Sequence, residues 1–234
     1  AKSISEGFAR NVISASFNGT TVETTTPLTT DGSLILYTWN DEDGKKAFWH
    51  STSHVMAQVL EQMYPGIKLT LGPAIANGFY YDVDFEEHKI TEADFKKIED
   101  RVLEISRGKH EFKLRPVSKA DALELYKDNV YKTEMITNLE DGTITFCDHD
   151  TFTDLCRGGH IPNTGIIKAM KIMSVAGAYW RGDEKKPMLT RIYGLAFENE
   201  EELKDYIRRR ELAMQRDHRK LGAELEIFLI DDEV

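Results

Sequence analysis

Two short motifs, far apart in the sequence, most constrain how this chain can fold. The segment HSTSH carries His50 and His54, and the segment CRGGH carries Cys156 and His160. At a spacing of four residues, two side chains on a helix project from the same face about one turn apart. By residue type, the four side chains also make up a tetrahedral zinc set. We therefore expect the fold to bring both segments into one site.

The first motif has the spacing of a zinc metalloprotease helix, but the resemblance to that class stops there. In such a helix a glutamate follows the first histidine as general base, whereas Ser51 stands at that position here. The sequence therefore argues against a metalloprotease. In the second motif, Gly158 and Gly159 let the backbone turn tightly between the cysteine and the histidine.

The N-terminal segment has the pattern of β-strands. Strands at 13–17 and 20–22 flank an Asn-Gly pair, the strongest short signal for a hairpin, and another apolar strand follows at 34–39. The polar segment 40–44 then breaks the pattern and is a candidate domain boundary. The opening segment is too short for a complete domain.

Helices and strands then occur in separate runs. One helix runs from Phe48 to the break at Tyr64, a second follows the capping residue Thr91, and a third opens at Ser118. The remaining apolar runs predict strands at 79–85, 143–147, 168–176 and 188–197. This order predicts an α+β fold, with an antiparallel sheet and helices, rather than an alternating parallel sheet.

A basic helix is predicted to begin at Asn199 and to continue to about Lys220. It either connects, solvated, to a further domain or contacts RNA directly. The formal net charge of −10 argues against a nucleic-acid partner unless basic residues gather on one face, because an acidic surface repels phosphates.

The composition predicts a soluble cytoplasmic protein. The 234 residues allow one large or two unequal domains, and 41% are hydrophobic without any apolar run of membrane-span length. No secretory signal is recognisable at the N-terminus, so Cys147 and Cys156 are expected to be free thiols. No membrane partner is expected.

Taken together, the motifs resemble those of a known family. HSTSH and CRGGH look like the paired signature of the second additional domain shared by threonyl- and alanyl-tRNA synthetases. Further segments resemble the bacterial threonyl-tRNA synthetases rather than the alanyl enzymes; they are NGFYYD (77–82), AYWRGD (178–183), RIYG (191–194) and RDHRKLG (216–222). The resemblance covers essentially the whole chain.

The resemblance implies three parts. Residues 1–43 would be the back half of a small β-grasp (TGS) domain, residues 44–198 an editing domain, and residues 199–234 a linker helix toward the catalytic domain. That catalytic domain, with its ATP site and its threonine-recognising zinc, would lie beyond this segment. The fragment should therefore neither activate threonine nor bind ATP. We expect it to be monomeric, whereas the parent enzyme is a homodimer.

The activity that the resemblance implies is editing, in which water hydrolyses serine from mischarged tRNA(Thr). Two residues, His50 and Lys132, are assigned to water activation and transition-state stabilisation. Cys156 and His160 would orient substrate and water, and His54 belongs to the same set. Taken alone, Lys132 would be interpreted as a solvated lysine between strand-like segments.

Two substrate-binding residues follow from the same resemblance. Asp154 would hold the seryl amine, and Tyr81 would line the pocket near the terminal adenosine, although its alternation with Phe79 is equally typical of a core residue. His149 receives no role. His88, His110 and His218 are interpreted as surface or linker residues.

Zinc and two competing functions stay open. A catalytic zinc keeps one position for water, and four protein ligands would close the site, so we expect editing to require no metal. One alternative is a freestanding deacylase of the alanyl type. Another is a non-enzymatic RNA-binding module in which zinc stabilises the fold through the His/Cys set.

Overall fold

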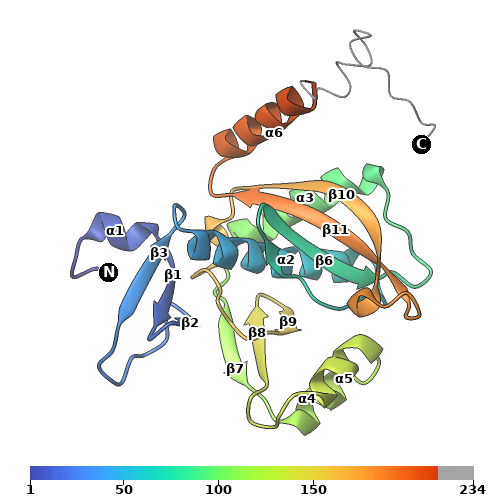
Figure 1. The fold of residues 1–234 in the computed structure, drawn as a ribbon, viewed down its shortest axis with the longest axis horizontal. Coiled ribbons are helices and arrows are strands. Elements are labelled where there is room, and N and C mark those ends of the chain that lie inside the picture. Colours follow the sequence, from blue (N-terminus) through green and yellow to red (C-terminus); the bar gives the residue numbers. More distant parts are fainter. Residues whose placement is uncertain (216–234) are drawn as a thin grey trace, which may run out of the picture.

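A long buried helix, α2 (Glu42–Met63), lies at the centre of the fold in the computed structural model, which describes residues 1–215 (Figure 1). Its polar residues from Ser51 to His54, and Gln58, are as deeply buried as its apolar ones. The hydroxyls of Ser51 and Thr52 donate to the carbonyls of Ala47 and Phe48 at 2.7 and 2.8 Å. Because these hydroxyls are paired inside the helix, they can be buried without losing their hydrogen bonds.

The helices α2 and α3 (Glu92–Arg107) cover one face of a five-stranded antiparallel sheet (Figure 1). The strand order is β10-β11-β6-β4, and β5 pairs with β6. The bounds of its strands are β4 Lys68–Leu69, β5 Ala74–Ile75, β6 Gly78–Asp84, β10 Ala169–Tyr179 and β11 Met188–Phe197. The main hydrophobic core lies between this sheet and the two helices.

A second lobe carries a three-stranded antiparallel sheet, in the order β7-β8-β9, with two short helices below it (Figure 1). Its small core is formed by Ala122, Ile136, Ile144 and Phe146. The elements of the lobe are β7 Lys113–Pro116, α4 Lys119–Leu125, α5 Val130–Thr137, β8 Thr145–His149 and β9 Phe152–Leu155. Two single 3-10 turns, η1 Thr164–Ile166 and η2 Trp180–Gly182, flank β10.

The N-terminal part is a small antiparallel sheet in the order β2-β1-β3, preceded by one short helix. At its hairpin, Asn18 and Gly19 both have positive φ, at 50° and 79°, as a two-residue turn requires. The elements are α1 Glu6–Asn11, β1 Val12–Phe17, β2 Thr20–Val22 and β3 Leu34–Thr38. Their assignment to a partial β-grasp domain stays a prediction.

The structure confirms the α+β class with antiparallel sheets, and it corrects two local predictions. Helix α2 begins at Glu42 rather than near Phe48, so the predicted boundary at residue 43 falls in its first turn. Lys132 lies on helix α5, not between strands, and is only 1% exposed, so its interpretation as a solvated lysine is wrong.

The C-terminal helix α6 (Glu200–Gln215) leaves the main sheet after β11 (Figure 1). Its first turn is fixed to the rest of the chain because the indole of Trp39 donates to Glu202 at 2.9 Å. The predicted continuation to Lys220, and His218, lie outside the described residues. None of the helices in residues 1–215 combines the length and the apolar character that a membrane span requires.

The irregular edge of the main sheet yields a stability prediction. A bulge interrupts β10 between Ile172 and Ser174, and there the buried carboxylate of Glu99 accepts the amide hydrogen of Ile172 at 2.9 Å. We expect Glu99→Ala to lower the free energy of unfolding by about 1–3 kcal/mol, because a buried donor loses its charged acceptor. Glu99→Gln, which keeps an acceptor, should cost less.

The measurement is urea denaturation followed by circular dichroism. Glu104→Ala is the matched control, because this residue lies on the same helix α3 with its side chain 62% exposed. An equal loss of stability in both alanine variants would contradict the role given to Glu99.

Candidate functional site

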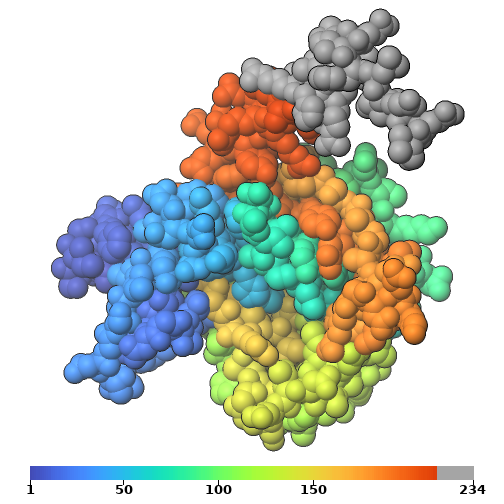
Figure 2. All heavy atoms as spheres, in the orientation of Figure 1, coloured from blue at the N-terminus to red at the C-terminus, as the bar shows by residue number. Residues whose placement is uncertain are grey.

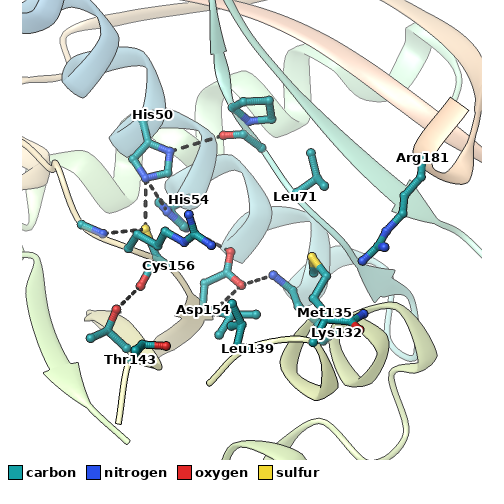
Figure 3. Close-up of a pocket in the computed structure, with 17 residues that line it drawn as sticks. His50, His54, Leu71, Lys132, Met135, Leu139, Thr143, Asp154, Cys156 and Arg181 are labelled. Carbon is teal, nitrogen blue, oxygen red and sulfur yellow. Dashed lines mark hydrogen bonds and ion pairs between the residues drawn. The ribbon is translucent and has the colours of Figure 1, made fainter. Parts of the chain in front are cut away.

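The structure brings the two motifs together in one cluster. The Nε2 atom of His50 lies 3.1 Å from the sulfur of Cys156 and 3.3 Å from Nε2 of His54. The same sulfur lies 3.3 Å from Nε2 of His160. The four ligand atoms all lie within 4.8 Å of one another, as Figure 3 shows for three of them. The expected juxtaposition is therefore present.

Ser51, which replaces the metalloprotease glutamate, joins the two motifs. Its hydroxyl oxygen accepts the amide hydrogen of Ile161 at 2.9 Å while it donates to the carbonyl of Ala47 in α2. On the other side, Thr145 of β8 donates to the carbonyl of Cys156, and the Cys156 amide donates to the Thr145 carbonyl at 3.1 Å. The cysteine loop is thus held between a core helix and a strand.

Each imidazole of the cluster has an acceptor beside its outer nitrogen. Nδ1 of His54 lies 3.1 Å from the carboxylate of Asp154, and Nδ1 of His160 lies 2.9 Å from that of Glu23. Nδ1 of His50 faces the carbonyl of Gly72 at 3.4 Å. Each outer nitrogen therefore has an acceptor for its hydrogen, as in metal-bound histidines.

The donor set fits a zinc ion. Ligand atoms of a tetrahedral zinc site lie about 3.3 to 3.8 Å apart, given bonds of about 2.0 to 2.3 Å. The three contacts within the cluster, at 3.1 to 3.3 Å, are close to that separation. The His50, His54, Cys156 and His160 side chains therefore form a possible metal-binding group.

Beside the cluster, a buried ion pair links Lys132 of α5 to Asp154 of β9. The lysine Nζ lies 2.5 Å from one carboxylate oxygen, which also accepts the Leu155 amide hydrogen at 2.8 Å. The other oxygen accepts from the hydroxyl of Tyr81 at 2.8 Å and lies next to His54. Four donors therefore surround the two oxygens of one carboxylate.

These contacts fix the charge state of Asp154. Burial alone would raise the pKa of the carboxyl, yet the Lys132 cation and the contact with His54 hold the pKa well below its usual range. Burial, together with the neighbouring carboxylate, raises the pKa of Tyr81 far above its ordinary value. The pair is therefore an ionised Asp154 with a neutral tyrosine.

The histidines differ in exposure and charge. Burial lowers the pKa of His50, which leaves its ring neutral near pH 7, and this ring is the only one of the three described cluster imidazoles that is partly exposed. Burial opposes the cationic form of His54 and His160, but Cys156 and the carboxylates raise the pKa of both. Three imidazoles in turn lower the pKa of the buried Cys156 thiol.

A pocket of about 590 Å³ opens beside the cluster (Figure 3). One end holds the ionisable groups of His50, His54, Cys156, Asp154 and Lys132. The exposed Arg157 and Arg181 line the same pocket, and the apolar part of its lining is formed by Leu71, Pro73, Met135, Leu139 and Leu155. The pocket thus combines ionisable side chains suited to acid–base catalysis with an apolar lining and two positive charges.

Two residues expected in the pocket are placed differently. Tyr81 has no exposed surface and lies behind Asp154 rather than in the pocket wall. His160 is likewise fully buried and takes no part in the wall. His149, given no role from the sequence, is buried near the cluster, where burial and the charges of His54 and His160 lower its pKa to about 3.

Sequence reasoning missed Glu23, Thr145 and Arg181. Arg181 lies within the AYWRGD segment that resembles the family, whereas no local signal marks Glu23 or Thr145, which meet the site only through tertiary contacts. Ser51 was noted only as a missing glutamate, although its place between the two histidines was a usable sign of a structural role.

Comparisons with known proteins agree with these observations. Residues 143–193, which include the cysteine motif, match the family model "Threonyl and Alanyl tRNA synthetase second additional domain". Over its full length the chain is 78% identical to the threonine--tRNA ligase of Flavobacterium johnsoniae, 52% to that of Cytophaga hutchinsonii and 47% to that of Bacteroides fragilis. The chain spans 36 to 37% of the length of these relatives. On this evidence it belongs to the threonyl-tRNA synthetase family and corresponds to a part that carries the second additional domain.

Proposed function

We propose that this part of the enzyme hydrolyses the ester of serine wrongly attached to the 3′ end of tRNA(Thr). The family supports the substrate class, because a synthetic pocket for threonine cannot strongly reject an amino acid that is smaller by one methyl group. Such a difference is worth only about 1–3 kcal/mol, so a second, hydrolytic sieve is required. The observation that carries the proposal is the Lys132–Asp154–His54 network beside the partly exposed His50.

Ester hydrolysis needs a base for the attacking water and a donor for the developing oxyanion. His50 suits the first role because its ring is neutral and partly exposed, and its Nδ1 faces a carbonyl. Nε2, which lies 3.1 Å from the Cys156 sulfur, is then the nitrogen that can accept a proton. Lys132 suits the second role, because Asp154 takes only one of its three ammonium hydrogens and the residue lines the pocket.

The geometry changes the role that we propose for Asp154. An ammonium group of the substrate would compete with four donors that already surround the carboxylate, which are Lys132, Tyr81, His54 and the Leu155 amide. We therefore assign Asp154 and Tyr81 to the positioning of Lys132 and His54. Cys156 and His160 hold the opposite side of the cluster, where they orient His50.

Zinc would be held by His50, His54, Cys156 and His160, and with four protein ligands it would cross-link the two motifs rather than activate water. In the proposed hydrolysis His50 must accept a proton, which a bound metal at Nε2 would prevent. We therefore propose that editing proceeds without metal. ATP and the threonine-recognising zinc are assigned to the remaining part of the parent protein.

The proposed partner is the 3′ end of tRNA. Arg157 and Arg181 line the pocket, and Lys185 and Lys186 lie on the same loop as Arg181, where Glu134 pairs with both Arg181 and Lys186. This local group of cations offers phosphates a site on a chain whose formal net charge is −10. We further propose a cytoplasmic location, a monomeric fragment and a homodimeric parent.

The second candidate function is a zinc-stabilised RNA-binding module without activity. It is favoured by one observation, the match between the donor set and a closed zinc site. A deacylase of the alanyl type is a third possibility that the family model, which covers both enzymes, leaves to experiment.

The first test compares wild-type protein with His50→Ala on seryl-tRNA(Thr) and on threonyl-tRNA(Thr). We expect selective hydrolysis of the seryl ester and a decrease of about 10²-fold or more in the variant, because general base catalysis is lost. His88→Ala is the matched control, since this exposed histidine lies outside the pocket and contacts the carbonyl of Pro65 and the ring of Tyr64. A His50→Ala protein with normal activity would refute the proposed base. Preference for mischarged tRNA(Ala), assayed in parallel, would favour the alanyl type.

The second test separates catalysis by Lys132 from its structural effect. Lys132→Met leaves Asp154 ionised and unpaired in the interior, which we expect to cost about 3–5 kcal/mol of stability. In the double variant Lys132→Met/Asp154→Asn both charges are absent, so much of the stability should return while hydrolysis stays at least about 10²-fold reduced. Urea denaturation and deacylation rates measure the two effects. Recovery of hydrolysis together with stability would show that Lys132 acts only on the fold.

The third test concerns metal. We expect the metal content of purified protein to have no bearing on the rate, so that deacylation continues after zinc has been removed by a chelator. Elemental analysis, circular dichroism and the deacylation rate are measured on the same sample. Unfolding on chelation together with absence of hydrolysis at any metal content would instead support the structural module.

A further inference from the structure

A carboxylate from the N-terminal part of the chain reaches the site. Glu23 directly follows strand β2, yet its side chain is only 10% exposed because it lies against the loop of the cysteine motif. One oxygen accepts the Gly159 amide hydrogen at 3.0 Å and lies 2.9 Å from Nδ1 of His160. The other accepts the His160 amide hydrogen at 3.3 Å. In the space-filling view the N-terminal residues pack beside this segment (Figure 2).

The loop is shaped to receive an anion. Gly158 and Gly159 have φ values of 98° and 88°, a conformation in which side chains are strained. Successive amides in such a turn point to one side and form a concave site for negative charge. A Cβ at Gly158 would come within 3.1 Å of the Glu23 carboxylate, so the glycine also gives the carboxylate room.

The stacking contacts of His160 fix the plane of its ring, and the contact with Glu23 assigns a hydrogen to Nδ1. The ring stacks on Phe112 with centroids 5.2 Å apart and planes 7° apart, and on His50 at 5.0 Å and 22°. Both faces are thus covered. At the edge, Nδ1 meets Glu23 at 2.9 Å and, more distantly, the sulfur of Cys147 at 3.6 Å. A carboxylate can only accept, so the hydrogen lies on Nδ1.

We propose that Glu23 is a positioning residue, which accepts the Nδ1 hydrogen of His160 and so keeps Nε2 of the ring turned toward Cys156. The hydrogen bond from Nδ1–H of His160 to Glu23 thereby makes the geometry of the cluster depend on a residue outside the domain that carries both motifs. The assignment of the proton rests on the contacts alone. Its effect on catalysis rests on the proposed hydrolysis.

The effect should appear in kcat and not in KM. Neither Glu23 nor His160 lines the pocket, so the substrate does not touch them, whereas the sulfur of Cys156 contacts both His160 and the proposed base His50. Loss of an outer hydrogen-bond partner of a site histidine typically reduces activity by about 10- to 100-fold. We expect a decrease of that size in kcat for Glu23→Met, which is of similar length but has no acceptor.

Two further variants complete the comparison. Glu23→Gln keeps an oxygen that can accept from Nδ1–H, so it should recover most of kcat. Glu111→Gln is the matched control. This glutamate lines the same surface pocket as Glu23, but its side chain is 66% exposed and pairs only with Lys113 among the described residues. Should Glu23→Met fail to fold, Glu23→Asp replaces it, since its shorter carboxylate cannot reach the ring.

The decisive measurement is the nitrogen-15 spectrum of the histidine rings, with His160→Asn used to assign the signal. We expect a proton on Nδ1 of His160 in the wild type, Glu23→Gln and Glu111→Gln, and its loss or exchange with Nε2 in Glu23→Met. An unchanged His160 spectrum in Glu23→Met would overturn the proposal. Because the spectrum is recorded without substrate, it decides the role of Glu23 even if the wild type hydrolyses no ester.

Discussion

The carboxylate of Asp154 is the group on which the rest of the site depends. It is buried, and it joins donors from α2, β6 and α5, elements that are distant in the sequence. An isolated buried carboxylate would be prohibitively costly, so the ion must be paired and fully hydrogen-bonded for the fold to exist. This requirement places Lys132 and His54 at fixed positions on one side of the pocket. The same contacts that stabilise the interior therefore determine the geometry of the proposed hydrolytic groups.

A second constraint is that two histidines of the central helix must lie in the core, and the polar segment between them makes their burial possible. Every hydroxyl between His50 and His54 donates to a backbone carbonyl, so the helix loses no hydrogen-bonding capacity by being buried. Ser51 also accepts from the chain after the second motif. The serine that stands in place of the metalloprotease glutamate is thus the contact that aligns the two halves of the cluster, and its replacement by glutamate would separate them.

Sequence reasoning succeeded where one residue's environment is set by its near neighbours. The Asn-Gly hairpin, the capped helix after Thr91 and the two four-residue motifs are all local patterns, and each is present. It failed for Lys132, because a lysine is buried only when a partner from another element meets it, and Asp154 does so across the fold. The role of Glu23 could not be predicted from the sequence for the same reason, because its partner His160 is 137 residues away.

The three cluster histidines share residue type and spacing, yet their surroundings divide them. His160 is enclosed by two rings, a carboxylate and a thiol, and has no exposed surface, so it cannot exchange a proton with a substrate or with water. His54 is bound to Asp154 and nearly as buried. Only His50 combines a neutral ring with access to the pocket. Because acid–base catalysis requires both properties in one group, the burial pattern, and not the motif, distinguishes the proposed base from the residues that hold it in place.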